Sequence, residues 1–135
     1  MIEPGQIQHR RALVAIDLGA ESCRVSLLRW QGDSPRISLL HRVSNGPVKV
    51  GDSLRWPLER ILVGVEEGLR KAAAVATEGI RSIAVDGWAV DYVRLGPDGK
   101  PAHAPFCYRD ERNIAAKVVV EEMISPQEHF AKTGA

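Results

Sequence analysis

The stretch that decides the fold is residues 12–28, which read Ala12-Leu13-Val14-Ala15-Ile16-Asp17-Leu18-Gly19-Ala20-Glu21-Ser22-Cys23-Arg24-Val25-Ser26-Leu27-Leu28. An apolar run ends in Asp17, a short polar turn follows, and a second apolar run begins at Cys23. Five apolar residues precede Asp17. We therefore expect a buried strand with this carboxylate at its carboxyl end, where open α/β sheets bind ligands. Asp17 is a candidate metal or phosphate aspartate.

The turn between the two runs has the chemistry of an anion site. Gly19 lets the backbone approach a ligand closely, successive N–H groups can surround an anion, and Ser22 and Arg24 add a hydroxyl and a positive charge. A P-loop and a dinucleotide fingerprint both open a helix, whereas a strand follows here, so neither motif fits. An ordinary hairpin with an exposed aspartate at its corner is the alternative.

Length and composition narrow the class of partner. The 135 residues are enough for one domain, and 18 basic against 17 acidic residues leave a net charge of +1. This balance gives no electrostatic reason to expect nucleic acid or an anionic membrane as partner, so we expect a small molecule. Two cysteines are too few for a disulfide framework, and the four histidines lack metal-ligand spacing.

The first residues do not have the pattern of a signal peptide. Residues 1–11 are polar and charged, which predicts a flexible leader before a domain over residues 12–135. No apolar run reaches the length of a membrane span. We therefore expect a reduced, cytoplasmic setting.

Short apolar segments bounded by turn residues predict several further strands. They are expected at 23–30, 37–43, 48–50, 54–56 and 83–85. The segment 37–43 should run antiparallel to the one before it. Asp86 follows the last strand as Asp17 follows the first, so two aspartates are expected at one edge of the sheet. The turn Gly96–Gly99 suggests a second hairpin, which would carry Trp88 and Asp91 over that edge.

Three helices are predicted. Pro57 should begin the clearest one, and Gly79 should end it in a Schellman motif. Its apolar face is expected to consist of Leu58, Ile61, Leu62, Val65, Leu69, Ala72, Ala73 and Ala76. Asn113 should cap a helix that runs to about Met123, and Ser125 should cap a last one.

Several segments, in this order along the chain, resemble the FGGY carbohydrate kinases, and among them the rhamnulokinase branch. They are the Asp17 hairpin, His41–Gly46, Val85–Val93, Pro97–Gly99 and Tyr108–Arg112. The resemblance implies an α/β fold of the ribonuclease H-like type that actin, heat-shock chaperones and sugar kinases share. In that fold a mixed sheet begins with three antiparallel strands and carries packing helices, and this chain would hold an incomplete, N-terminal part of it.

The resemblance also implies phosphoryl transfer from ATP, with Mg²⁺, to a hydroxyl of a ketose such as L-rhamnulose. Asp17 matches the aspartate beside the magnesium ion. Nucleotide phosphates would be bound by Gly19, Ala20, Glu21, Ser22, Cys23 and Arg24. Sugar contacts are expected at Asp86, Trp88, Ala89 and Asp91. Three of these four also have a structural alternative: packing for Trp88, loop capping for Asp86 and solvent exposure for Asp91.

Two departures from the family pattern bear on specificity. Glu21 stands where the family has a small hydroxyl residue, and a carboxylate near phosphate is repulsive unless it points away or meets Mg²⁺. Gly87-Trp88-Ala89 replaces the Thr-Trp-Gly of the branch, which removes a hydroxyl, adds a methyl group and leaves the sugar open. The family's general base lies downstream of the Tyr-Arg-Asp segment, so no catalytic residue is expected here and the 135 residues alone should be nearly inactive.

Three interpretations remain open at this point. The chain is the N-terminal portion of a sugar kinase, or a catalytically dead module that keeps a phosphate or sugar site for binding or regulation. The third interpretation is an interaction protein that forms homo-oligomers through uncovered sheet surface.

Overall fold

The computed structural model describes residues 11–134, which form two compact units. The first unit consists of the chain up to Pro47 together with Pro57–Val90, and the second of Val48–Trp56 together with the chain from Asp91 onward. The leader expected at residues 1–11 lies, apart from Arg11, outside the described residues. The assignment of residues 12–135 to one domain stays a prediction.

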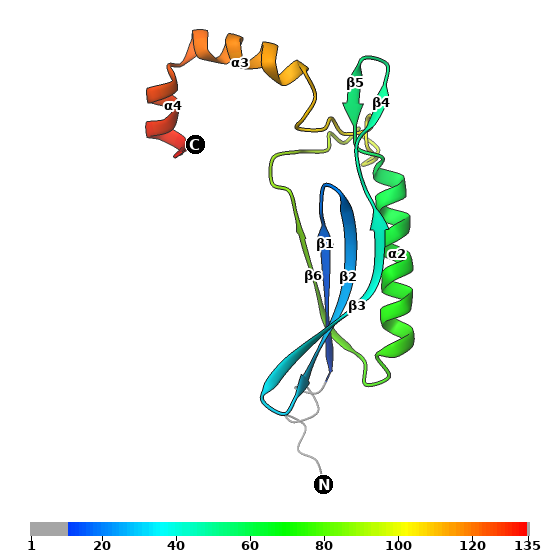
Figure 1. Cartoon of the computed structure of the whole chain (residues 1–135). Helices are drawn as coiled ribbons and strands as arrows, with labels where there is room; N and C mark the ends of the chain where they lie inside the picture. Colours follow the sequence, from blue (N-terminus) through cyan, green and yellow to red (C-terminus); the bar gives the residue numbers. More distant parts are fainter. Residues whose placement is uncertain (1–10, 135) are drawn as a thin grey trace. The chain divides into compact units, whose positions relative to one another are not determined.

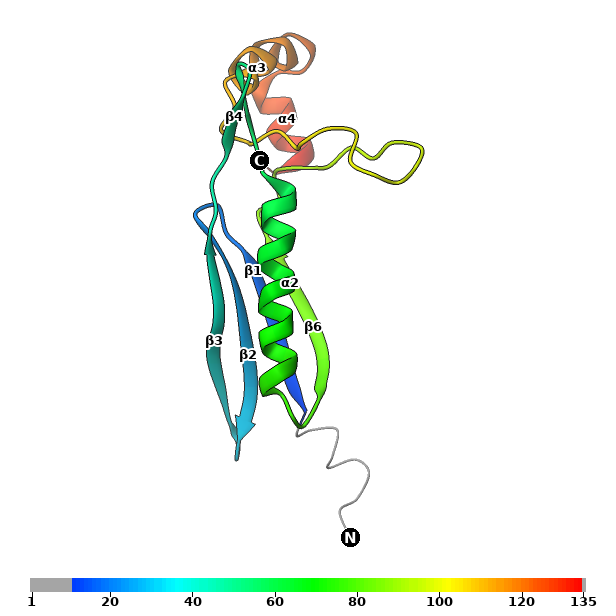
Figure 2. The ribbon, with the colours of Figure 1, turned by 90° about the vertical axis from the view of Figure 1, so that its right-hand side faces the viewer.

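The first unit contains a four-stranded mixed sheet in the order β3-β2-β1-β6 (Figures 1 and 2). Its strands are β1 (Ala12–Leu18), β2 (Ser22–Gln31), β3 (Ser34–Ser44) and β6 (Ile80–Gly87). The first three are antiparallel neighbours, and β6 runs parallel to β1. The predicted mixed sheet with three antiparallel strands is therefore confirmed.

One face of this sheet is covered by α2 (Leu58–Val75), as Figure 2 shows. Alternate residues of β1 and β2 point toward the helix and form the core. Val14, Ile16, Val25 and Leu27 are at most 4% exposed. Because side chains alternate along a strand, the residues next to these four, Asp17 and Arg24 included, lie on the opposite face.

Two glycines set the face that α2 buries. A Cβ atom on Gly64 would lie 2.6 Å from Val43 Cγ1, and one on Gly68 would collide with Val25. The helix thus packs on the sheet along Ile61, Gly64, Gly68 and Ala72. The expected inward positions of Leu62 and Ala73 are wrong, because this close approach turns both side chains to solvent.

The ends of α2 also differ from the prediction. Pro57 is the residue before the helix rather than its first residue, and Val75 is the last helical residue. Gly79 does not form a Schellman stop. It has a φ of +86° in a separate turn, where its N–H donates to the Ala76 carbonyl at 2.8 Å. This turn reverses the chain into β6 and therefore needs glycine.

The second unit begins with a hairpin of β4 (Val48–Val50) and β5 (Ser53–Arg55). Arg55 pairs with Phe106, and the guanidinium carbons of Arg55 and Arg112 both lie 3.3 Å from the Phe106 ring centroid. The predicted hairpin around Gly96–Gly99 is reduced to one isolated antiparallel pair, Leu95 with Pro101.

The last two helices are α3 (Arg112–Met123) and α4 (Pro126–Thr133). Asn113 does not cap α3, because the helix already begins at Arg112, and Asp110 Oδ1 accepts the Arg112 N–H at 3.1 Å. The Ser125 cap of α4 is confirmed by a bond from the Glu128 N–H to Ser125 Oγ of 3.2 Å. Across residues 11–134, no helix is long and apolar enough to cross a membrane.

Candidate functional site

The predicted phosphate turn is a tight connection between β1 and β2. Leu18 pairs with Cys23, and the Gly19 N–H donates to the Ser22 carbonyl at 3.2 Å, which leaves Ala20 and Glu21 at the tip. A Cβ atom on Gly19 would lie 2.7 Å from the Ser22 oxygen. Glycine is therefore required here by close approach of the backbone to itself.

Four charged residues lie in one row across the sheet. Asp86 is in register with Asp17, Asp17 with Arg24, and Arg24 with Arg42. Residues in register share a face, so the whole row lies on the face away from α2. Arg24 Nη1 donates to Asp17 Oδ2 at 2.5 Å. The row therefore runs from two carboxylates to two guanidinium groups.

This arrangement is suited to a metal-complexed polyphosphate. Mg²⁺ is usually held by one or two carboxylates together with phosphate oxygens and water, and guanidinium groups bind phosphate through paired hydrogen bonds. Asp17 and Arg24 are 46% and 43% exposed, so a ligand can reach both. Within residues 11–134, no three or more His, Cys, Asp or Glu side chains are grouped so that they could hold a metal ion.

The two residues that open β2 differ in what they can offer a ligand. Ser22 is 3% exposed, and its Oγ has no hydrogen-bond partner in the described part of the chain. Cys23 points to the α2 face, and burial, followed by the negative charge of Asp17, raises the pKa of its thiol. A protonated, buried thiol cannot contact an anion on the other face. Cys23 can contribute only its backbone there.

The tip residues are open to solvent. Glu21 is exposed, and its carboxylate has no ion pair or hydrogen bond among the described residues. The N–H groups of Ala20 and Glu21 donate no backbone hydrogen bond within residues 11–134. Two donors at the tip are therefore available to an anion.

The predicted sugar residues fall into two groups. Asp86 belongs to the charged row, and the half-buried Trp88 and exposed Ala89 follow directly after β6. Asp91 belongs to the second unit, where its Oδ2 accepts a hydrogen bond of 2.5 Å from Nε1 of the buried Trp56. One oxygen of Asp91 is thus already engaged within the protein.

Two residues at the site were not predicted as site residues from the sequence. Arg42 completes the charged row, and Asn45 donates from Nδ2 to the Gly19 carbonyl at 2.9 Å and from its backbone N–H to the Glu21 carbonyl at 2.8 Å. Both lie in the segment His41–Gly46, whose sequence indicated only the resemblance to the rhamnulokinase branch. The cross-strand register that brings them to the turn is the signal that could have identified them.

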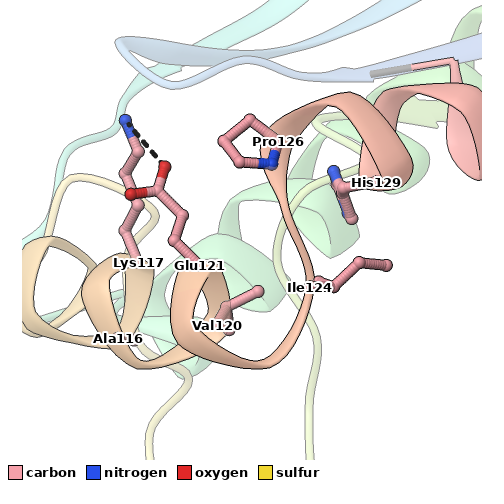
Figure 3. A pocket seen from close by; sticks show the side chains of 7 residues that line it. All are labelled: Ala116, Lys117, Val120, Glu121, Ile124, Pro126 and His129. Carbon is pink, nitrogen blue, oxygen red and sulfur yellow. Dashed lines mark ion pairs between the residues drawn. The ribbon is translucent and has the colours of Figure 1, made fainter.

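A separate hollow of about 460 Å³ lies between α3 and α4 (Figure 3). Its apolar lining includes Val120, Ile124 and Pro126, and Lys117 pairs with Glu121, also in the lining, at 3.6 Å. It contains none of the predicted phosphate or sugar residues.

Comparison with known proteins finds similarity to proteins named as sugar kinases. No protein-family model matches the sequence. A rhamnulokinase of Ligilactobacillus salivarius is 32% identical over 124 residues, which are 92% of this chain and 25% of that protein. The chain is related to the carbohydrate kinases. It spans about a quarter of the length of this relative.

Solved structures agree with this relationship at the level of the fold. Gluconate kinase from Lactobacillus acidophilus matches with a TM-score of 0.72 at 16% identity, over 92% of this chain and 25% of that chain. Xylulose kinase from Rhodospirillum rubrum also matches with a TM-score of 0.72, at 15% identity over 90% of this chain and 25% of that chain. The predicted fold, that of the N-terminal domain of sugar kinases of the actin-like ATPase type, is confirmed.

Proposed function

We propose that this carbohydrate-kinase chain binds the phosphates of ATP, as its Mg²⁺ complex, at the turn Gly19–Arg24. The observation that carries the proposal is the row of two carboxylates and two guanidinium groups beside a turn with open N–H donors. Asp17 would hold the metal ion, and Arg24 and Arg42 would bind phosphate oxygens. Ser22 Oγ, buried and without a partner among the described residues, is a further donor.

The Asp17–Arg24 ion pair suits a site that works with a metal. In this ion pair, Arg24 takes the place of a metal ion at Asp17, and Asp17 takes the place of a phosphate at Arg24. Both charges are therefore neutralised. A half-exposed pair of this kind contributes little stability, so a ligand with both a cation and phosphates can replace it at small cost. Bound Mg²⁺ neutralises charge on the transferred phosphoryl group, and such transfer depends mainly on positioning and charge neutralisation.

The acceptor in this proposal is a ketose, with L-rhamnulose as the first candidate because a rhamnulokinase is among the relatives. Asp86 would bind a sugar hydroxyl, Trp88 would stack on the ring, and Ala89 would lie beside it. A cytoplasmic location belongs to the same proposal, since both cysteines are free and ATP is a cytoplasmic cofactor.

Calorimetry with MgATP tests the proposal on the 135-residue chain. We expect the wild type to bind, and Arg24→Gln to weaken binding about tenfold or more, because a charged hydrogen bond is worth about 1.5–3 kcal/mol. Arg42→Gln should weaken binding in the same direction. Arg36→Gln is the matched control, since Arg36 is an exposed arginine of the same strand near its other end. No binding by the wild type, or an equal loss in Arg36→Gln, contradicts the proposal.

The sugar is tested separately by titration with L-rhamnulose and D-xylulose. We expect a preference for the first and a loss of binding in Trp88→Ala. Binding of MgATP and sugar without any phosphoryl transfer, by a protein of the full length of the relatives, would favour a binding or regulatory module instead.

A second candidate function is self-association. Ile83 and Val85 are 51% and 63% exposed on β6, at the edge of the described sheet. They are in register with the buried Val14 and Ile16, so they share the face that α2 covers elsewhere. Sedimentation velocity should show a dimer that Val85→Lys abolishes. The weakest dimers that such an experiment detects have dissociation constants on the order of 100 μM. If the wild type is monomeric at that concentration, this candidate is excluded.

A further inference from the structure

Asn45 makes two hydrogen bonds to the turn from outside it. It follows directly after β3, and its Nδ2 and backbone N–H donate to the carbonyls of Gly19 and Glu21, at 2.9 Å and 2.8 Å. These carbonyls belong to the peptide groups on either side of the tip residues Ala20 and Glu21. One residue thus holds both ends of the tip.

The bond to Gly19 also fixes the direction of a donor. The peptide bonds of the described residues are trans, so the Ala20 N–H points opposite to the Gly19 carbonyl. While Nδ2 of Asn45 holds that carbonyl, the Ala20 N–H faces away from Asn45, and it has no backbone acceptor among residues 11–134. If this peptide group rotated, a carbonyl oxygen would replace the N–H on the ligand side and would repel phosphate.

The other polar atom of the Asn45 amide does not contact the turn. Its Oδ1 is buried and has no partner in the described part of the chain. An unpaired buried acceptor is unfavourable, and rotating the amide would not relieve it, because Oδ1 would then meet the Gly19 oxygen. Nδ2 therefore lies on the turn, and Oδ1 lies away from it.

We infer that Asn45 is a positioning residue for phosphate binding, which orients the Gly19–Ala20 peptide so that its N–H faces the nucleotide. The inference rests on the proposed function. Asn45 itself touches only the turn, so its effect on the ligand passes through the peptide that it holds.

The test uses Asn45→Ala and the isosteric Asn45→Asp, with Asn113→Ala as the matched control. Asn113 also donates from Nδ2 to a backbone carbonyl, that of Tyr108 at 2.7 Å, but it does so in the second unit. Calorimetry should show MgATP affinity reduced about three- to tenfold in both Asn45 variants, the effect of one neutral hydrogen bond. Asn113→Ala should leave the affinity unchanged.

A second readout separates positioning from general loss of stability. Nitrogen-15 relaxation should show greater mobility of the Ala20 and Glu21 amides in Asn45→Ala, even without nucleotide, and no change there in Asn113→Ala. Unchanged mobility in Asn45→Ala overturns the inference, and so does an equal loss of affinity in the control. Failure of the wild type to bind MgATP counts against the proposed function, and the relaxation measurement then decides alone whether Asn45 orients the turn.

Discussion

Replacing each of the two buried glycines of α2, Gly64 and Gly68, with alanine tests how closely the helix packs on the strands that carry the charged row. Each substitution gains about 1 kcal/mol of helix propensity and adds a methyl group to a filled interface, where overpacking costs about 1–3 kcal/mol. At Gly64 the new Cβ would lie 2.6 Å from Val43 Cγ1 and 3.4 Å from Val43 Cβ. We expect Gly64→Ala to lower the free energy of unfolding by up to about 2 kcal/mol.

At Gly68 the collision reaches the base of the opposing side chain. The new Cβ would lie 2.6 Å from Val25 Cβ, an atom that no rotation of the side chain can move. The helix must therefore shift away from β2, and we expect Gly68→Ala to cost about 2 kcal/mol or more after the propensity gain.

Second substitutions distinguish the two cases. Val43→Ala leaves only an ordinary 3.4 Å contact to the new Cβ at residue 64, so the double variant should show a favourable coupling of about 1 kcal/mol. Val25→Ala leaves the 2.6 Å contact in place and should not rescue Gly68→Ala. Urea unfolding followed by circular dichroism measures the free energies of the wild type, the four single variants and the two double variants. A Gly68→Ala chain as stable as the wild type, or the absence of coupling in the Gly64–Val43 pair, refutes the reasoning.

Three further predictions concern the second unit. The Leu54 N–H, followed by the Arg112 N–H, lowers the pKa of Asp110. The ionised carboxylate therefore stabilises the fold above the pKa of about 3.9 that Asp110 has in the unfolded chain, and this stabilisation is lost as the pH falls below that value. Asp110→Asn should be less stable than the wild type at pH 7 and should lose less stability on acidification. Parallel profiles of unfolding free energy against pH for the two proteins would refute this. Trp56→Phe removes the bond to Asp91 and should lower unfolding free energy by about 1 kcal/mol or more, measured by urea titration; an unchanged midpoint contradicts it. Ser125→Ala removes the α4 cap and should cost about 1 kcal/mol of helix stability, seen as faster amide exchange in that helix and not in α3.

Local patterns were enough to predict the parts of the fold that depend on neighbours in sequence. The β1 and β2 hairpin around Asp17 and the Ser125 cap are such features, because alternation and capping act over a few residues. The buried face of α2 was predicted less well. Its centre is set by Gly64 and Gly68, and their importance depends on the strands that lie opposite them, which periodicity does not reveal.

The phosphate turn was predicted as a set of residues, but its supports were not. Asn45 reaches Gly19 across 26 positions of sequence, and Asp110, rather than Asn113, accepts the first N–H of α3. Both contacts depend on how separate segments meet. A sequence pattern can indicate which side chains have the required chemistry, whereas the pairing of strands decides which of them share a site.

The position of Arg42 shows how finely this pairing is set. Near the β2–β3 turn the strands pair regularly up to Ser26 with Leu39, but the next pair is Val25 with His41, so Leu40 is an extra residue that forms a β-bulge. If Leu40 instead paired regularly with Val25, His41 would lie opposite Arg24, and the side chain of Arg42 would turn to the α2 face. The bulge therefore places the second guanidinium group beside the first and directs His41 to α2, where Lys71 Nζ lies 2.9 Å from its Nδ1. Deleting Leu40 removes the bulge but leaves Val25 opposite His41 and Arg24 opposite Arg42. The deletion variant should therefore bind MgATP about as well as the wild type, whereas Arg42→Gln should weaken binding, and a folded deletion variant that binds as weakly as Arg42→Gln would show that this register does not set the phosphate site.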